Sequence, residues 1–567
     1  MQYETLAVCV GVSGHRDISD KNISDVLSAT RKVLTDIAAL TPNSAHVLIS
    51  SLAEGGDRIA ARCALEMGWQ LGVVLPAAAA IYRPDFKTRQ SQEEFDELMS
   101  QASWIHEVDP QNSQQPDYLA AGMVVMQCSL LLLAYWDSAS PRLEGGTTDI
   151  VSRFLSDIPV LSDESRGDMT IDARPVIQIK VTRSGVSAGS DSSYEGDIVW
   201  LMPETAGQTS NEKERWQTIL KRFDGFNLDA KACWDSSSDM VKKSLLELDS
   251  QGITEFSRLS KLAKTFALAD VMSLQAQRER NWILYQIVGL TFLSVIFEHL
   301  YSDWHPFQGY LGVAVIFGLL AVAVYKTGKR RRIEDRYLDY RALAEACRVQ
   351  YFWRKIGFEE SVNQYFLVEQ DDELEWIRRA VVASETPRTD HLAEQPVDFM
   401  KIKAVKQEWI DKQKNYFIGS ANGSGKRKAY LHHEKEEFWS KTANRIFFTG
   451  VGLVIFLVFS RSLVISQLHE FGHGLIEVLD VSYGVLFALA GLIKVYQEVN
   501  AFSEHGRSYL KLGLSMSRAS RHLDEAIQRD DIRVALAILH AVGCNSLDEN
   551  ADWLILHRDR PVQVSIG

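Results

Sequence analysis

Two pairs of long apolar segments dominate the hydrophobic pattern of this chain. The first pair covers residues 283–301 and 309–325, and the second covers 446–466 and 481–499. At about 1.5 Å of rise per residue, each segment is long enough, or nearly so, to cross a hydrocarbon core of about 30 Å. We therefore expect an all-α membrane domain with four transmembrane helices, arranged as two hairpins in a lipid bilayer.

Basic residues predict the orientation of these hairpins. Lys326 and residues 329–332 follow the second apolar segment, whereas the turn between the first two segments contains neither Lys nor Arg. Because basic loops are retained on the cytoplasmic side, we expect both ends of each hairpin to be cytoplasmic. The expected location is the inner (cytoplasmic) membrane, with multiple passes and with the N- and C-termini in the cytoplasm.

The segments that flank the first hairpin carry a helical seam. Apolar or small residues recur at steps of three and four from Leu259 to Ala276 before the hairpin, and from Ile333 to Tyr351 after it. This spacing is typical of a helix face that packs on another helix. A plain membrane anchor with amphipathic flanks has the same spacing. We expect the seams to pack several copies of the chain into a homo-oligomer.

The N-terminal part of the chain alternates between short apolar runs and amphipathic stretches. We expect strands at 6–12, 45–50, 71–75, 126–135 and 175–181, and helices at 23–40 and 59–67. Strands that alternate with helices predict a parallel sheet of the Rossmann-like α/β type. In such a sheet the ligand crevice lies at the carboxyl ends of the strands.

Three glycine-containing turns fall at these predicted carboxyl ends. In such a turn, free backbone N–H groups at the start of a helix can hold a phosphate, and a neighbouring Arg can bind it through two hydrogen bonds. The candidate ligand-binding residues from these turns are Gly11, Ser13, Gly14, His15, Arg16, Ser51, Glu54, Gly55, Gly56, Asp57, Arg58, Gly145, Gly146, Thr147 and Asp149. His15 and Arg16 could equally be a helix-start histidine and a surface arginine, and Asp57 a helix cap.

The second turn and the residues after it resemble a known family. The stretch 50–65 (SSLAEGGDRIAARCAL), followed by 73–76 (VVLP) and 82–86 (YRPDF), resembles the motif series of the SLOG superfamily. This Rossmann-like group is shared by the DNA-processing protein A, the LOG phosphoribohydrolases and the ligand-binding region of TRPM channels. The resemblance covers about residues 5–183. It implies a nucleotide or nucleotide-derived ligand and adds Pro76, Tyr82 and Asp85 to the candidate site.

The third turn departs from the LOG enzymes. Those hydrolases carry two glycines, a spacer, Gly-Thr and then a Glu that acts on the glycosidic bond, whereas here Gly145-Gly146 runs directly into Thr147-Thr148-Asp149. We therefore favour ligand binding over catalysis, with no catalytic residue and no cofactor beyond the signalling ligand. The alternative is a membrane-anchored hydrolase of nucleotide N-glycosidic bonds that uses Asp149 or Glu54 instead.

Residues 335–348 (DRYLDYRALAEACR), directly after the first hairpin, resemble the SLATT effector families. These are membrane modules found joined to or beside SLOG sensors in bacterial conflict systems. The likeness covers about residues 256–356 and, more loosely, 436–525. It implies a pore or membrane-disrupting effector that is switched by a nucleotide signal in antiviral defence.

Charge and cysteine content narrow the function classes. The net charge of −13 argues against a general nucleic-acid binder, because contact with phosphate backbones requires a basic surface. The six cysteines form no CxxC pair, which fits reduced thiols and implies no metal cage. The expected domains are 1–205 (nucleotide binding), 206–255 (connector), 256–356 (first stalk and hairpin), 357–440 (helical cytosolic insertion), 441–530 (second hairpin and stalk) and 531–567 (cytosolic tail).

One motif points to a different class of protein. His469-Glu470-Phe471-Gly472-His473 fits HExxH, which on a helix places two imidazoles on one face for zinc, with the Glu as general base. Gly472 disfavours a helix, and Asp480 lacks the following Gly of the third-ligand motif in intramembrane metalloproteases. We therefore rank a zinc site at His469, Glu470 and His473 below an outer loop.

Overall fold

The computed structural model describes most of the chain. The described residues are 4–19, 23–108, 115–138, 143–156, 158–160, 169–171, 173–184, 196–203, 212–250, 259–304, 307–358, 360–366, 374–385, 398–419, 427–464 and 473–558. The chain divides into two compact units. The first comprises Met1–Glu247, Gln251–Leu268 and Ala346–Pro396, and the second comprises Leu248–Ser250, Ala269–Glu345 and Val397–Gly567.

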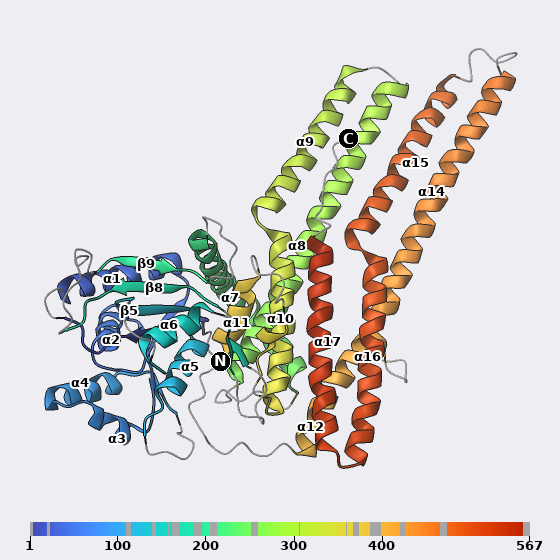
Figure 1. Ribbon diagram of the computed structural model, residues 1–567. Coiled ribbons are helices and arrows are strands. Elements are labelled where there is room, and N and C mark those ends of the chain that lie inside the picture. Colours follow the sequence, from blue (N-terminus) through green and yellow to red (C-terminus); the bar gives the residue numbers. More distant parts are fainter. Residues whose placement is uncertain are drawn as a thin grey trace. The chain divides into compact units, whose positions relative to one another are not determined.

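The first unit is built on a seven-stranded sheet with the order β4-β3-β2-β1-β5-β8-β9 (Figure 1). Its strands are β1 (Ala7–Gly14), β2 (Ala45–Ser50), β3 (Gln70–Leu75), β4 (Trp104–Glu107), β5 (Leu131–Trp136), β8 (Val176–Lys180) and β9 (Ile198–Leu201). All neighbouring pairs are parallel except β8 and β9, which are antiparallel. Strands β6 (Ile158–Val160) and β7 (Met169–Ile171) form a separate antiparallel pair. The expected α/β fold is confirmed, with a mixed, mostly parallel sheet.

Helices pack on both faces of this sheet. The elements between the strands are α1 (Ile23–Leu40), α2 (Gly56–Glu66), α3 (Ala79–Tyr82), the 3₁₀ turn η2 (Arg83–Asp85), α4 (Arg89–Ser100), α5 (Tyr118–Cys128) and α6 (Thr147–Leu155). Helix α1 contacts α2, and α5 contacts α6. Because crossovers between parallel strands are right-handed, the connections running from β1 toward β4 lie on one face, and those returning through α5 and α6 lie on the other.

The sequence pattern placed the start of one strand five residues too early. A strand was expected over 126–135, but residues up to Cys128 belong to helix α5 and the strand begins at Leu131. The whole stretch is apolar, because the end of α5 and the start of β5 are both buried. A continuous apolar run cannot by itself separate a buried helix from a buried strand.

Helix α7 (Glu212–Leu248) closes the amino-terminal edge of the sheet. Asp224 accepts hydrogen bonds from the Asn43 backbone N–H and the Ser44 hydroxyl, both at 2.8 Å, just before β2. The Asn227 side chain bonds both the N–H and the carbonyl of Leu6, each at 2.9 Å, just before β1. The opposite, carboxyl edge is therefore the one left for a ligand. The unit also contains η4 (Val362–Gln364) and α11 (Glu375–Ser384).

The second unit is helical. Its elements are α8 (Ser260–His299, shared with the first unit), the π-turn η3 (Leu300–Trp304), α9 (Gln308–Arg330), α10 (Ile333–Lys355, also shared), α12 (Phe399–Val405), the π-turn η5 (Lys406–Asp411), α13 (Lys412–Phe417), α14 (Lys428–Val464), α15 (His473–Asn500), α16 (Phe502–Gln528) and α17 (Ile532–Arg558). Four helices among the described residues are long and apolar enough to cross a membrane. They contain the expected segments 283–301, 309–325 and 481–499, and the third of them, Lys428–Phe459, covers the expected segment 446–466 as far as Phe459. The expectation of four candidate membrane spans in a helical region is therefore confirmed.

The two seams are buried within a single chain. Ile333, Tyr337 and Ala344 of α10 are each no more than 5% exposed, as are Phe266 and Ala269 of α8. Tyr337 accepts a hydrogen bond from Gln277 of α8 at 3.1 Å. The seams therefore pack on other parts of the same chain, and the expectation that they are free to join separate copies is corrected. Both helices keep the predicted period because that period marks a buried face, whichever element covers it.

The HExxH segment falls almost entirely outside the described residues. His469 and Glu470 are not described, and His473 is the first residue of α15. The zinc alternative therefore stays an expectation.

Candidate functional site

The connectivity of the sheet singles out one position at its carboxyl edge. From β1 the chain runs outward through β2, β3 and β4, and then returns to β5 on the other side of β1. Ligands in open α/β sheets bind at such a switch point, outside the carboxyl ends of the two diverging strands. Here that position lies beyond Gly14 of β1, which pairs with Tyr135 of β5.

The backbone of His15 is held at the switch point by strand β5 and by the start of helix α2. Its backbone N–H donates to the Tyr135 carbonyl at 3.0 Å, and its own carbonyl accepts from the Gly56 N–H at 3.2 Å. Its imidazole Nε2 lies 3.0 Å from Oδ1 of Asp137, just after β5. The ends of β1 and β5 and the start of α2 thus converge on one residue.

Three glycines allow this close approach. Gly55 has φ +81°, and a Cβ there would lie 2.3 Å from the His15 carbonyl oxygen. A Cβ on Gly14 would lie 2.9 Å from the Cα of Gly56, and a Cβ on Gly56 would lie 2.7 Å from the Tyr135 side chain. Since real Cβ atoms do not tolerate such distances, any other residue would push the first two turns apart.

Helices α2 and α6 both begin at this edge with glycine N-caps. Gly55 precedes α2 and Gly146 precedes α6, so neither N-cap residue has a side chain that could cap its helix. Helix α5 differs, because the Asp117 carboxylate accepts from the Ala120 N–H at 2.9 Å. The Gly56 N–H at the start of α2 donates to the His15 carbonyl. The partial positive charge of each helix N-terminus remains, and it favours a bound anion.

Asp57 supports the turn between β2 and α2. Its side chain is 4% exposed and accepts hydrogen bonds from the Ser50 hydroxyl at 3.2 Å and from the backbone N–H groups of Ser51 and Ala53. Burial raises the pKa of this carboxyl to about 7, although these hydrogen bonds and the positive charge of Arg16 oppose the shift. The buried Asp57 carboxyl therefore holds the backbone of this turn through hydrogen bonds.

Arg16 lies in an aromatic and acidic cluster. Its guanidinium carbon is 5.3 Å from the centroid of the Tyr118 ring, and the Tyr118 hydroxyl is hydrogen-bonded to the Asp85 carboxylate. Tyr82 packs edge-on against Tyr118, with ring centroids 6.3 Å apart. Burial opposes the charge on Arg16, but Tyr82, Tyr118 and Asp85 outweigh it and raise its pKa. Arg16 therefore stays a cation at this edge of the sheet.

The third turn is held by Asp149. The Gly145 N–H donates to Asp149 Oδ2 at 3.1 Å, and Arg153 Nε lies 3.0 Å from both carboxylate oxygens. Gly145 has φ +69°, and a Cβ there would be 2.7 Å from the backbone nitrogen of Leu119. The turn is therefore packed against the start of α5, next to the cluster around Arg16.

Two of the predicted site residues are engaged by α4. Arg58, 1% exposed, donates from Nε to the Leu52 carbonyl at 3.1 Å and from Nη1 to Ser91 and Glu94 at 2.9 Å. The Glu54 carboxylate accepts from the Ser91 hydroxyl. These bonds tie the second turn to α4.

The remaining predicted residues are spread along the edge. Ser13 pairs with Ala134 of β5, Thr147 opens α6, and the Pro76 carbonyl accepts from the Asp117 N–H at 2.8 Å. Gly11 lies inside β1, where a Cβ would be 2.4 Å from Ser129 Oγ, so it lets α5 approach the sheet.

Sequence reasoning missed two residues of this edge, Tyr118 and Asp137. Asp137 directly follows a buried strand, which is a usable signal, because polar residues at that position face the crevice. Tyr118 opens a helix after a polar stretch, and only the packing of α5 brings it over Arg16.

No protein-family model matches the chain, and no curated protein matches it. The SLOG and SLATT resemblances therefore rest on the motifs alone.

Proposed function

We propose that the α/β unit binds a small, phosphorylated, nucleotide-derived ligand beyond the carboxyl ends of β1 and β5. The observation that carries the proposal is the convergence of Arg16 and His15 with the glycine N-caps of α2 and α6 at one switch point. The guanidinium and the partial positive charge of the two helix N-termini all favour negative charge, and a phosphate group supplies that charge. Tyr118 adds an aromatic surface beside the phosphate position.

Binding is favoured over hydrolysis by the bonding of the two nominated carboxylates. Asp149 is 2% exposed and is held by Gly145 and Arg153, and Glu54 is bonded to Ser91. A general acid or base must reach the reacting bond within hydrogen-bond distance. Carboxylates committed to neighbouring turns suit the support of a binding site better than that task.

We further propose that the helical unit is the effector, a ligand-gated pore or membrane-disrupting module of a bacterial antiviral defence system. Four apolar helices support a membrane location. Helix α8 supports coupling, because it begins in the first unit and continues without a break into the second. In this proposal the termini are cytoplasmic and the ligand acts by favouring the open state over the closed one.

A pore further implies several copies of the chain. The apolar segments carry few polar groups, and an ion or water path through hydrocarbon needs polar partners. Since the seams of α8 and α10 are buried within each chain, the copies would meet through other surfaces. A closed homo-oligomer is the simplest such arrangement.

The test uses the full-length chain in dye-loaded vesicles with AMP, cyclic nucleotides and ADP-ribose. We expect calorimetry to show that one of these nucleotides binds the protein, and we expect the same nucleotide to trigger release of the dye. Arg16→Gln should weaken binding about ten-fold or more, because a charge-assisted hydrogen bond contributes ~1.5–3 kcal/mol. Arg31→Gln is the matched control, because Arg31 is an exposed residue of α1 paired with Glu66.

Three outcomes would change the proposal. Steady release of free base from the bound nucleotide would establish the hydrolase instead. Nucleotide binding without dye release would indicate a membrane-anchored receptor that does not open a pore. Equal binding by the Arg16 and Arg31 variants would show that the ligand does not occupy the switch point.

A further inference from the structure

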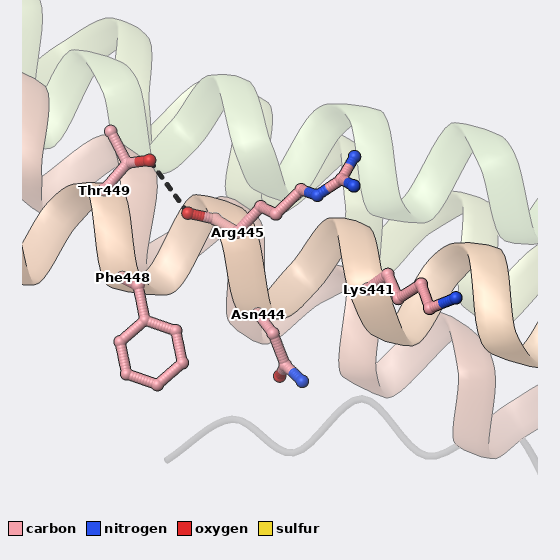
Figure 2. Close-up of a pocket in the computed structure, with 5 residues that line it drawn as sticks. All are labelled: Lys441, Asn444, Arg445, Phe448 and Thr449. Carbon is pink, nitrogen blue, oxygen red and sulfur yellow. Dashed lines mark hydrogen bonds between the residues drawn. The ribbon is translucent and has the colours of Figure 1, made fainter.

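The surface of helix α14 carries a shallow hollow. Five residues line it, all from one face of the helix: Lys441, Asn444, Arg445, Phe448 and Thr449 (Figure 2). The hollow has a volume of about 690 Å³ and is widely open to the surroundings of the helix. All five side chains are exposed in the single chain.

This hollow lies where α14 changes from polar to apolar. On the N-terminal side the helix carries exposed charges such as Glu437. On the C-terminal side the exposed side chains are apolar, including Phe448 at 68%, Phe456 at 59% and Phe459 at 65%. A helix that changes in this way places the junction at the level of the lipid headgroups.

The Arg445 side chain of the hollow points toward the polar part of α14, as expected for a cation at the edge of the hydrocarbon (Figure 2). Figure 2 shows the Arg445 side chain extending back along the helix toward Lys441, away from the apolar turns. Long basic side chains behave in this way when they reach from the hydrocarbon edge to the interface. Lys441 is paired with Glu437, whereas no ion pair is recorded for Arg445 within the described residues.

Neighbouring helices of the same unit add basic and aromatic residues at this level. Lys494 of α15 lies 3.3 Å from Ser440 Oγ of α14. The Tyr496 ring of α15 packs against both Trp439 of α14, at 5.4 Å, and Tyr285 of α8, at 5.9 Å, between ring centroids. Rings of Trp and Tyr mark the membrane interface, and basic residues there attract anionic lipid.

We propose that this hollow binds the headgroup phosphate of an anionic phospholipid. Arg445 and Lys441 hold the phosphate, Asn444 donates to the headgroup, and Phe448 lies along the first part of an acyl chain. The charge of the hollow, its position at the junction and its exposed apolar floor together favour a lipid over a soluble anion. This proposal is independent of the ligand site in the α/β unit.

The test measures lipid binding to the full-length chain in a non-ionic detergent by native mass spectrometry. Phosphatidylglycerol and phosphatidylcholine with identical acyl chains are compared, with inorganic phosphate as a separate arm. We expect phosphatidylglycerol to bind more tightly and the double variant Lys441→Gln, Arg445→Gln to weaken its binding about ten-fold or more. The charge-matched control is Lys511→Gln, Arg521→Gln, two exposed positions on α16.

Each result decides the proposal. Because the substituted side chains are exposed, both double variants should keep the unfolding temperature of the parent protein. A selective loss of phosphatidylglycerol in the α14 variant supports the site. Equal losses of phosphatidylglycerol binding in both double variants would show that net charge alone causes the effect, and this result would overturn the proposal. Inorganic phosphate binding as tightly as the lipid would also overturn it, as would equal binding of the two lipids.

Discussion

His15 and Asp137 join the two halves of the sheet at its switch point, with 3.0 Å between the imidazole Nε2 and the carboxylate Oδ1. His15 follows β1 and Asp137 follows β5. The two strands are parallel, and the chain leaves them toward opposite sides of the sheet, so the contact joins the two halves at the edge where a ligand would enter.

Gly55→Ala should destabilise the protein more than Gly68→Ala. Both glycines have positive φ, +81° and +77°, so both substitutions carry the left-handed backbone cost of about 1–2 kcal/mol. Only Gly55 also faces a backbone atom, the His15 carbonyl oxygen at 2.3 Å, whereas nothing lies within 4 Å of a Cβ on Gly68. Urea unfolding should separate the variants by a further ~1–3 kcal/mol, and equal losses would contradict the tight packing of the two turns.

Asp57 should make stability depend on pH below neutrality. Burial raises its pKa from 3.8 to about 7, so between these values the folded protein keeps a proton that the unfolded chain has lost. Stability should therefore fall as the pH rises from about 4 to 7 and level off above, with a slope of up to ~1.4 kcal/mol per pH unit. Asp57→Asn should remove this slope in urea unfolding curves.

A control for the pH experiment is Asp96→Asn. Asp96 is exposed, and its hydrogen bond to Arg83 lowers its pKa below 3.8. Its contribution is therefore lost only as the pH falls through that lower value, and the slope between pH 4 and 7 should persist in this variant. If Asp57→Asn keeps the slope as well, the carboxyl of Asp57 is not the titrating group.

Asp224→Ala should weaken the attachment of α7 to the sheet. The substitution leaves the buried Ser44 hydroxyl and the part-buried Asn43 N–H without their acceptor, at a cost of roughly 1–3 kcal/mol. Asp239→Ala on the same helix is the control, because Asp239 is 96% exposed and pairs with the exposed Lys242. This substitution should change stability by less than ~0.5 kcal/mol. Similar losses of stability in both variants would show that the substitutions act on the stability of helix α7 and not on its attachment to the sheet.

Ala344→Asp should unfold the helical unit. Ala344 is 4% exposed, and a lone buried charge costs several kcal/mol, roughly 3–5. Leu514→Asp, at a position that is 47% exposed on α16, should be tolerated. Thermal unfolding in detergent together with light scattering checks this. If Ala344→Asp instead gives a stable, well-folded monomer, the seam of α10 would again be the expected interface between copies of the chain.

The amino-acid sequence by itself determined which segments of this protein form helices, strands, turns and apolar spans. Helix α1 and strand β2 have the bounds that the hydrophobic period predicts, because burial of one face imposes that period locally. The four apolar helices were equally readable, since crossing hydrocarbon requires length and composition alone. Gly55 and Gly145 were correctly placed in turns, where both adopt positive φ.

Only the tertiary structure decided which of these parts meet. The order of the strands, with β1 between β2 and β5, sets the switch point, and that order is fixed by pairings between distant segments. The same packing brings Tyr118 over Arg16 and Asp137 to His15, and it turns Arg58 toward α4. The seams show the difference most clearly: their period reveals a buried face, but what covers that face depends on the fold of the whole chain.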